Sequence, residues 1–399
     1  MVDPPVRTLS QSRWWVRLGA AVLAGLAVVA GCQSPGRRVP FRAPPAGPIA
    51  PAETPRPVPP GVTLCGPLEP DPGLRPPRHV LALSSGGLYG AYSTGFLAGW
   101  TKSGTRPEFD VVTGVSTGAL IAPLAFLGPE FDDRSQQLYT GVRAEDVFRI
   151  RAWVTIPFKD AVASSAPLRQ LIESQVDQEM MDRIAAEHRK GRRLYVGTTN
   201  LETRRLVIWD MGAIACRPCP EGCRLFRDVL LASCSVPGML PPVTFSVESG
   251  GRTVSELHGD GGVASQVFVP SVVFRAAAAG TADGPVVPGA GGNLYAVVSG
   301  KLYPDANPVR RRVLPILGAT TETIMYAHCR AELTSLYGQA KLAGMQYHLT
   351  SLRQDMPVNA ETLMSIDQGE MTKLYAEGLK DGVDGPAWRY APPDICSGK

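Results

Sequence analysis

Short apolar runs alternate with helical patterns along the chain from residue 79 onwards. Four of these runs predict strands, over residues 79–84, 109–115, 194–200 and 293–299. Apolar residues at helical spacing predict a helix directly after each of the first two strands, and further helices over residues 165–176, 180–188, 320–351 and 367–380. Because strands and helices alternate, we expect a three-layer α/β/α domain with a central, mostly parallel sheet.

Two further pairs of runs predict β-hairpins. Residues 205–209 are the expected hairpin partner of the strand at 194–200. Residues 243–247 and 252–257 flank a glycine pair and predict a second hairpin. This hairpin leads directly into a short polar stretch that contains Asp260 between glycines.

The first 31 residues predict the signal peptide of a lipoprotein. Three arginines precede an apolar run, residues 18–30, which is short for a membrane span. The run ends in Val29-Ala30-Gly31-Cys32, which resembles the lipobox of bacterial lipoproteins, so Cys32 is the expected lipidation site and membrane anchor. In that family an aspartate after the cysteine retains the protein at the inner membrane. Gln33 stands there instead, which favours the outer membrane; the alternative for this segment is an ordinary signal peptide or an anchor helix.

Residues 32–78 are rich in proline and can bury too little apolar surface to fold, so an extended tether is expected here. A folded domain at 79–390 and a tail at 391–399 are expected to follow.

The net charge of the chain is +4, of which the signal peptide contributes +2 and the tether +3. The rest therefore carries −1 and offers no basic field for nucleic acid. The basic clusters at 189–193 and 310–312 are interpreted as solvated loop charges, with contact to anionic lipid headgroups as the alternative.

Residues 109–120 place Gly114-x-Ser116-x-Gly118 between a strand and a helix. This is the sequence form of a nucleophile elbow, in which a serine hydroxyl is exposed on a sharp turn. Gly114 and Gly118 are expected to be necessary because the turn is crowded. The helix that follows directs unpaired N–H groups toward the place where an oxyanion would form. Ser116 is therefore a candidate nucleophile, although a small residue in a tight turn is the simpler interpretation of the motif alone.

A second glycine-rich turn, Ser85-Gly86-Gly87-Leu88-Tyr89-Gly90, follows the first predicted strand. A glycine pair in this position presents backbone N–H groups to an anion, which suits either a phosphate cradle or an oxyanion hole. No lysine follows in the P-loop arrangement, and the elbow lies shortly downstream. An oxyanion hole built from Gly86 and Gly87 is therefore favoured.

Three features in this order resemble the patatin-like phospholipases: the glycine-rich turn, Gly114-x-Ser116-x-Gly118, and Asp260-Gly261-Gly262. Further stretches that look like that family lie at 199–203, 232–238 and 371–378. The resemblance implies a serine–aspartate dyad with no essential histidine. We expect no cofactor and no metal. Ser116 would attack an ester carbonyl, Asp260 would take its proton, and backbone N–H groups at Gly86 and Gly87 would hold the oxyanion.

The glycine-rich turn departs from the family pattern, which is Gly-Gly-Gly-x-Arg/Lys-Gly. Ser85 replaces the first glycine and Tyr89 replaces the cation. The two central glycines keep the backbone donors, so hydrolysis is still expected. The missing cation weakens the expectation of a phospholipid headgroup.

Histidines offer an alternative partner for the serine, as in a catalytic triad. His328 and His348 come late enough in the chain for that role, but both fall within predicted helices rather than on loops after strands. His258, two residues before Asp260, is expected to line the site without being essential.

Three cysteines lie close together in Cys216-x-x-Cys219-x-x-x-Cys223. This spacing suits a metal site, but no fourth ligand is evident. In an oxidising envelope a disulfide is favoured, and its pairing is left open.

We therefore expect a lipid-anchored serine acyl hydrolase that acts on acyl lipids: phospholipid, lysophospholipid or acylglycerol. The alternatives are a carboxylesterase or thioesterase with little phospholipid activity, and a catalytically silent envelope lipoprotein that binds an acyl chain.

Overall fold

The computed structural model describes residues 56–58, 73–152, 159–249, 252–280, 290–357, 367–384 and 388–393. The predicted signal peptide, the predicted lipidation site Cys32, most of the predicted tether and most of the tail lie outside these residues.

The described residues form a nine-stranded main sheet. Its strands are β1 Arg56–Val58, β2 His79–Leu83, β3 Val111–Val115, β6 Arg193–Asn200, β7 Arg205–Asp210, β8 Val243–Ser249, β9 Arg252–Asp260, β10 Asn293–Val298 and β11 Gln346–Ser351. The order is β1-β8-β9-β6-β3-β2-β10-β11, with β7 also paired to β6. The central run from β6 to β11 is parallel, whereas β7 and β9 are antiparallel to β6. Both predicted hairpins, β6–β7 and β8–β9, are confirmed.

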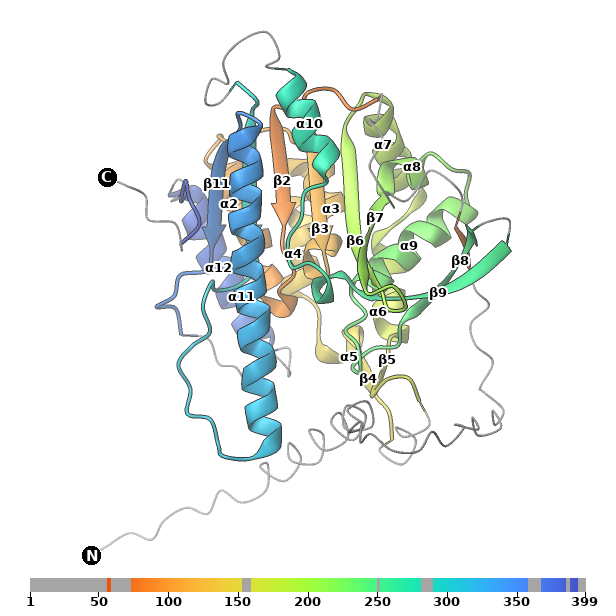
Figure 1. The fold of residues 1–399 in the computed structure, drawn as a ribbon, viewed down its shortest axis with the longest axis vertical. Coiled ribbons are helices and arrows are strands. Elements are labelled where there is room, and N and C mark those ends of the chain that lie inside the picture. The colour runs from red at the N-terminus through yellow and green to blue at the C-terminus, as the bar shows by residue number, and fades with distance from the viewer. Residues whose placement is uncertain are drawn as a thin grey trace, which may run out of the picture.

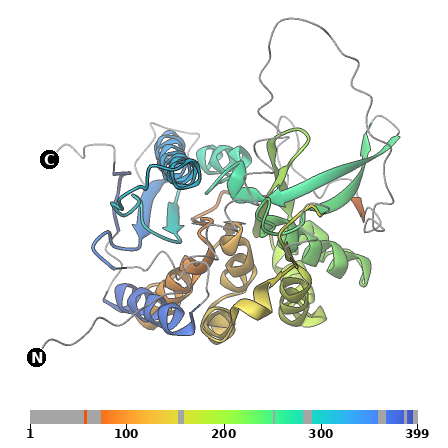
Figure 2. The ribbon, with the colours of Figure 1, turned by 90° about the horizontal axis from the view of Figure 1, so that it is seen from below.

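Helices cover both faces of this sheet (Figures 1 and 2). They are α2 Gly90–Lys102, α3 Thr117–Leu127, α4 Asp132–Thr140, α5 Ala144–Val147, α6 Ala166–Gln175, α7 Gln178–Arg189, α8 Met211–Ala215, α9 Glu221–Ser233, α10 Ser271–Ala279, α11 Val313–Leu342 and α12 Gln368–Val383, with 3-10 turns η1 Gly87–Tyr89, η2 Pro129–Phe131 and η4 Gly261–Val263. A separate two-stranded sheet joins β4 Arg149–Ile150 and β5 Ala163–Ser164. No helix within the described ranges is both long and apolar enough to cross a membrane.

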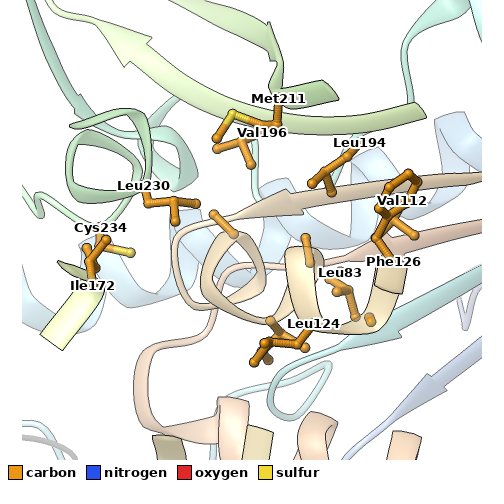
Figure 3. Packing of buried hydrophobic residues seen from close by; sticks show 14 of the residues in the cluster. Leu83, Val112, Leu124, Phe126, Ile172, Leu194, Val196, Met211, Leu230 and Cys234 are labelled. Carbon is orange, nitrogen blue, oxygen red and sulfur yellow. The ribbon is translucent and has the colours of Figure 1, made fainter. Parts of the chain in front are cut away.

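Two hydrophobic layers hold the helices to the sheet, because successive side chains of a strand point to opposite faces. On β2, Leu81 and Leu83 pack in the layer that includes α2, α3, α9 and α12. Val80 and Ala82 of the same strand pack in the layer under α10 and α11. Figure 3 shows part of the first layer, the buried cluster to which Leu83 of β2, Val112 of β3 and Leu124 of α3 belong. The predicted three-layer α/β/α architecture is confirmed.

The prediction of one helix over residues 320–351 is wrong in its last part. The helix α11 ends at Leu342, and Gly344 follows with a φ of 70°, a conformation that suits glycine. Residues 346–351 form β11, which pairs with β10 and buries Tyr347 and Leu349. Sheet pairing and burial therefore outweigh the local helical pattern, and His348 lies on a strand.

Part of the predicted tether belongs to the sheet. Residues 56–58 form the edge strand β1, which pairs in parallel with β8, and Val58 is buried. An edge strand tolerates the proline at position 57, since one of its sides needs no donor. Leu74 also packs in the layer under α10 and α11. The packed part of the chain therefore begins before residue 79.

Candidate active site

Ser116 lies on the sharp turn between β3 and α3. Its φ of 53° and ψ of −120° are unusual for a residue other than glycine. The turn is close-packed: a Cβ atom on Gly114 would lie 2.3 Å from the carbonyl oxygen of Gly118. A Cβ atom on Gly118 would lie 2.5 Å from the carbonyl oxygen of Leu83, at the end of β2. Both positions therefore exclude a side chain, and the elbow lies directly against the start of the glycine-rich turn.

Asp260 reaches Ser116 because β6 pairs with two strands along its length. Val115 of β3 is opposite Gly197, and Asp260 of β9 is opposite the next residue, Thr198. The end of β3 and the end of β9 therefore meet on β6. The Ser116 hydroxyl donates a hydrogen bond to Asp260 Oδ2 at 2.6 Å.

The backbone and the carboxylate of Asp260 are both held in place. Oδ1 accepts a hydrogen bond from the Gly262 N–H at 2.7 Å, and the Asp260 N–H donates to the Ser235 carbonyl at 2.8 Å. Burial raises the pKa of Asp260 to about 6, although the hydrogen bonds from Ser116 and Gly262 act in the opposite direction. Such a carboxyl is ionised at neutral pH and is basic enough to accept a proton.

The glycine-rich turn places Gly86 and Gly87 beside the elbow. Gly86 has a φ of 157°, and a Cβ atom there would lie 1.9 Å from the carbonyl oxygen of Ser299. Gly87 has a φ of 55° but open space around its Cα. Among the described residues, no acceptor is bonded to the N–H groups of Gly86 and Gly87. These donors are therefore available to an anion.

Residues 81–273 match the family model of patatin-like phospholipases. This segment is a patatin-like phospholipase domain. The matched range runs from β2 into α10 and includes the glycine-rich turn, the elbow and Asp260. The family places the domain among the lipid acyl hydrolases.

No curated protein matches the chain. Among solved structures, the crystal structure of VipD from Legionella pneumophila is similar, with 12% sequence identity and a TM-score of 0.33. The similarity covers 77% of this chain and 67% of that chain.

The patatin-like domain holds the backbone of Ser116 through α9. The Ser116 N–H donates to Ser233 Oγ at 2.9 Å, and this hydroxyl donates to the Gly197 carbonyl at 2.7 Å. The Cys234 thiol donates to the Ser116 carbonyl at 3.3 Å. Burial, reinforced by the charge of Asp260, raises the pKa of Cys234, so this thiol stays neutral. In the sequence, residues 232–238 resemble the family only as a stretch, since no pattern marks which hydroxyl bonds to the elbow.

Gln266 is a second residue that the sequence did not single out. Its backbone carbonyl accepts from the Ser85 N–H at 2.8 Å, and its side chain bonds to the Ser85 hydroxyl and to the Gly262 carbonyl. Its own N–H donates to Glu332 Oε2 on α11 at 2.8 Å. Gln266 therefore ties the glycine-rich turn, the Asp260 loop and α11 together.

The candidate histidines have other partners than Ser116. His328 pairs with Glu332 at 3.4 Å, and His348 bonds to Asn293 at 3.0 Å. His258 bonds to Thr198 Oγ1 at 2.8 Å, close to the dyad but not in contact with the Ser116 hydroxyl. Burial lowers the pKa of His258, against the opposing influence of Glu256. Within the described residues, the side chain that contacts the Ser116 hydroxyl is thus a carboxylate.

Two cysteines of the predicted cluster form a disulfide, Cys219–Cys223. Cys216 is a free thiol. In the described part of the chain, no group of three or more His, Cys, Asp or Glu side chains is arranged to hold a metal ion. The expected disulfide in this cluster is therefore present, and it joins Cys219 to Cys223.

Proposed function

We propose that the domain hydrolyses acyl ester bonds of lipids with Ser116 as the nucleophile and Asp260 as the general base. The observation that carries this proposal is the 2.6 Å hydrogen bond from the Ser116 hydroxyl to Asp260 Oδ2. The serine oxygen attacks the ester carbonyl while its proton passes to Oδ2. Collapse of the tetrahedral intermediate returns that proton to the leaving alcohol. Asp260 then takes a proton from a water molecule as the water oxygen attacks the acyl carbonyl, and it returns that proton to Ser116 Oγ when the acyl group leaves as a carboxylic acid.

The N–H groups of Gly86 and Gly87 are the proposed oxyanion hole. They lie on the turn that packs against the elbow, and they have no acceptor among the described residues. One donor of this kind lowers the barrier by about 3 kcal/mol. The contact between Gly86 and Ser299 fixes the turn before substrate binds, so the donors need no reorganisation during the reaction.

Tyr89 favours a second candidate, a carboxylesterase or thioesterase with little phospholipid activity. The side chain is partly buried beside Gly300. Burial, and then the neighbouring Tyr326, Asp305 and Glu322, raise the pKa of Tyr89 well above its usual value, so the phenol is neutral. The turn therefore offers no side-chain cation to a phosphate at the position where the family carries one. Turnover of phospholipid compared with a neutral acylglycerol of the same acyl chains separates the two candidates.

We also propose that the protein is anchored through lipidated Cys32, at the outer membrane. The lipobox-like sequence before Cys32 and the glutamine after it support this location. Metabolic labelling with radioactive palmitate tests it. Cys32→Ala should abolish the label, and label that persists in this variant would contradict the assignment.

A fluorophosphonate probe, which labels activated serines, tests the enzymatic proposal. The full chain in detergent should be labelled, Ser116→Ala should not, and Asp260→Asn should lose turnover with the fold intact. Ser135→Ala, which removes a buried serine on α4, is the matched control and should be labelled normally. Absence of labelling and of short-chain ester hydrolysis in the parent chain would favour a silent, acyl-binding lipoprotein.

A further inference from the structure

The amino-terminal part of α11 extends beyond the sheet. Figure 1 shows α11 continuing past the carboxyl-terminal end of β2. The elbow lies at this same end of the sheet. Its buried residues are Leu333, Leu336 and Ala340, all in the carboxyl-terminal part. We call residues 309–325 the α11 arm.

The bond between Gln266 and Glu332 marks where α11 passes the glycine-rich turn. An α-helix rises about 1.5 Å per residue, so Val313, at the start of α11, lies about 28 Å further along the axis than Glu332. The arm is therefore a projecting helix on the side of the molecule that carries the candidate active site.

The arm carries an exposed apolar stripe that points away from the domain. Val313, Ile316, Leu317 and Ile324 are 71%, 50%, 41% and 63% exposed. At about 100° per residue, these four side chains fall within a sector of roughly 100° on the helix. On the same wheel, the buried residues Leu333, Leu336 and Ala340 fall on the opposite side. The stripe is thus separate from the face that packs on the sheet.

The threonine hydroxyls among these apolar residues are already hydrogen-bonded within the helix, and Glu322, the acidic residue of the arm, falls on the opposite side of the wheel from the stripe. The hydroxyls of Thr320, Thr321 and Thr323 donate to backbone carbonyls four residues earlier, at 2.8, 3.0 and 2.7 Å. A hydroxyl bonded in this way costs less to remove from water. The arm is therefore suited to enter an apolar surrounding.

A basic cluster adjoins the stripe. Arg310, Arg311 and Arg312 are exposed directly before the helix begins, and residues 306–321 contain no acidic side chain. The partner that fits must offer an apolar layer next to negative charge. An exposed helix with one apolar side and neighbouring arginines matches the boundary between acyl chains and anionic headgroups.

We propose that the α11 arm docks on the surface of an anionic lipid bilayer, with the stripe at the acyl boundary and the three arginines on the headgroup phosphates. The choice of lipid as partner rests on the proposed function, while the surface itself is independent of Ser116 and Asp260. A second copy of the chain is the competing occupant: a parallel two-fold contact through the stripe would bring the two arginine clusters together, whereas an antiparallel one would separate them.

Hydrogen–deuterium exchange of the full chain carrying Ser116→Ala tests this docking without hydrolysis of the vesicles. Vesicles of phosphatidylcholine with phosphatidylglycerol should slow amide exchange in the α11 arm, and phosphatidylcholine alone should do so much less. Because exchange is followed peptide by peptide, binding through the predicted N-terminal anchor is distinguished from binding through the arm.

Two sets of substitutions define the contact. The first set is the triple variant Ile316→Gln, Leu317→Gln and Ile324→Gln, which should abolish the protection of the arm. Leu342→Gln is the matched control and should keep the protection, because Leu342 is 81% exposed but lies at the other end of α11. Replacing all three arginines by glutamine should weaken binding of the arm to anionic vesicles on the order of 100-fold.

A third readout separates docking from chemistry. In a chain with Ser116 intact, the stripe variants should hydrolyse a soluble short-chain ester normally but a vesicle substrate slowly. No hydrolysis of either substrate by the parent chain would count against the proposed function and leave the exchange experiment valid. Absence of protection in the arm, or a dimer that the stripe substitutions dissociate, would overturn the docking proposal.

Discussion

The ionised carboxyl of Asp260 is expected to lower the stability of the fold at neutral pH. Its pKa is about 6 in the folded protein, against an ordinary value of 3.8. Each pKa unit corresponds to about 1.36 kcal/mol, so burial of this charge costs about 3 kcal/mol of unfolding free energy when the group is ionised. Below pH 3.8 the carboxyl is protonated in both states and the cost is absent. Between pH 3.8 and about 6 the unfolded chain has lost the proton that the folded state still binds, so stability falls as the pH rises and the full cost is reached above 6.

The substitution Asp260→Asn removes this charge and keeps the local hydrogen bonds. The asparagine oxygen can accept from the Gly262 N–H, and its amide can donate to the Ser116 oxygen. The variant should therefore unfold at higher urea concentration than the parent at pH 7.5, by up to about 3 kcal/mol, and match it near pH 4. Urea unfolding followed by tryptophan fluorescence at pH 4, 5.5 and 7.5 measures this difference. Turnover should be lost at every pH.

A buried aspartate in an ion pair provides the control of opposite sign. Asp228 is fully buried and pairs with Arg169 at 2.7 Å, so Asp228→Asn should reduce stability at pH 7.5 because it leaves the arginine without its counter-charge. A less stable Asp260→Asn variant at pH 7.5, or a stability difference that does not change with pH, would refute the reasoning about Asp260.

Three further predictions concern the same site. The kcat/KM for a soluble ester should rise with pH around a midpoint near 6 and be about tenfold lower at pH 5 than on its plateau; His348→Gln should leave that midpoint unchanged, and a shifted midpoint would implicate the histidine. Gly86→Ala should lower kcat by about 10² or more, because the added Cβ displaces the glycine-rich turn. Gly87→Ala has room for a Cβ and meets only the strain of its φ of 55°, so it should reduce kcat less; equal losses in steady-state assays would argue against this geometry. Ser233→Ala should lower the unfolding free energy by about 1–3 kcal/mol, because it leaves the buried Ser116 N–H without its acceptor; an unchanged melting temperature would contradict this role.

The features of the site that could be predicted from the sequence are those with local geometry. A tight turn between a strand and a helix requires glycine at positions 114 and 118 whatever surrounds it. The motif can therefore be recognised from the sequence alone. The hairpin β8–β9 can be predicted for a similar reason, because alternating apolar runs around a glycine pair are a local signal. No local pattern sets the distance between Ser116 and Asp260, so the expectation that they pair rests on family resemblance.

The features that could not be predicted depend on long-range contacts. Ser233 and Gln266 look like ordinary polar residues, and their positions beside the elbow follow from the packing of α9 and α11. The helical pattern of residues 346–351 predicts that His348 lies on a helix, whereas pairing with β10 makes these residues a strand. The strand β1 could not be predicted for the same reason, because pairing with β8 stabilises it and its own proline-rich composition does not favour a strand.

The pairing of β6 with both β3 and β9 limits the positions at which this protein can accept insertions or deletions. Because β6 pairs with β3 and then with β9, the distance between Ser116 and Asp260 depends on the register of β9 on β6. A slip of one residue would shift Asp260 by about 3.3 Å and turn its side chain to the other face of the sheet. Insertions and deletions should therefore be tolerated at the far end of the β8–β9 hairpin, whereas a single added or lost residue among His258, Gly259 and Asp260 should separate the base from the nucleophile.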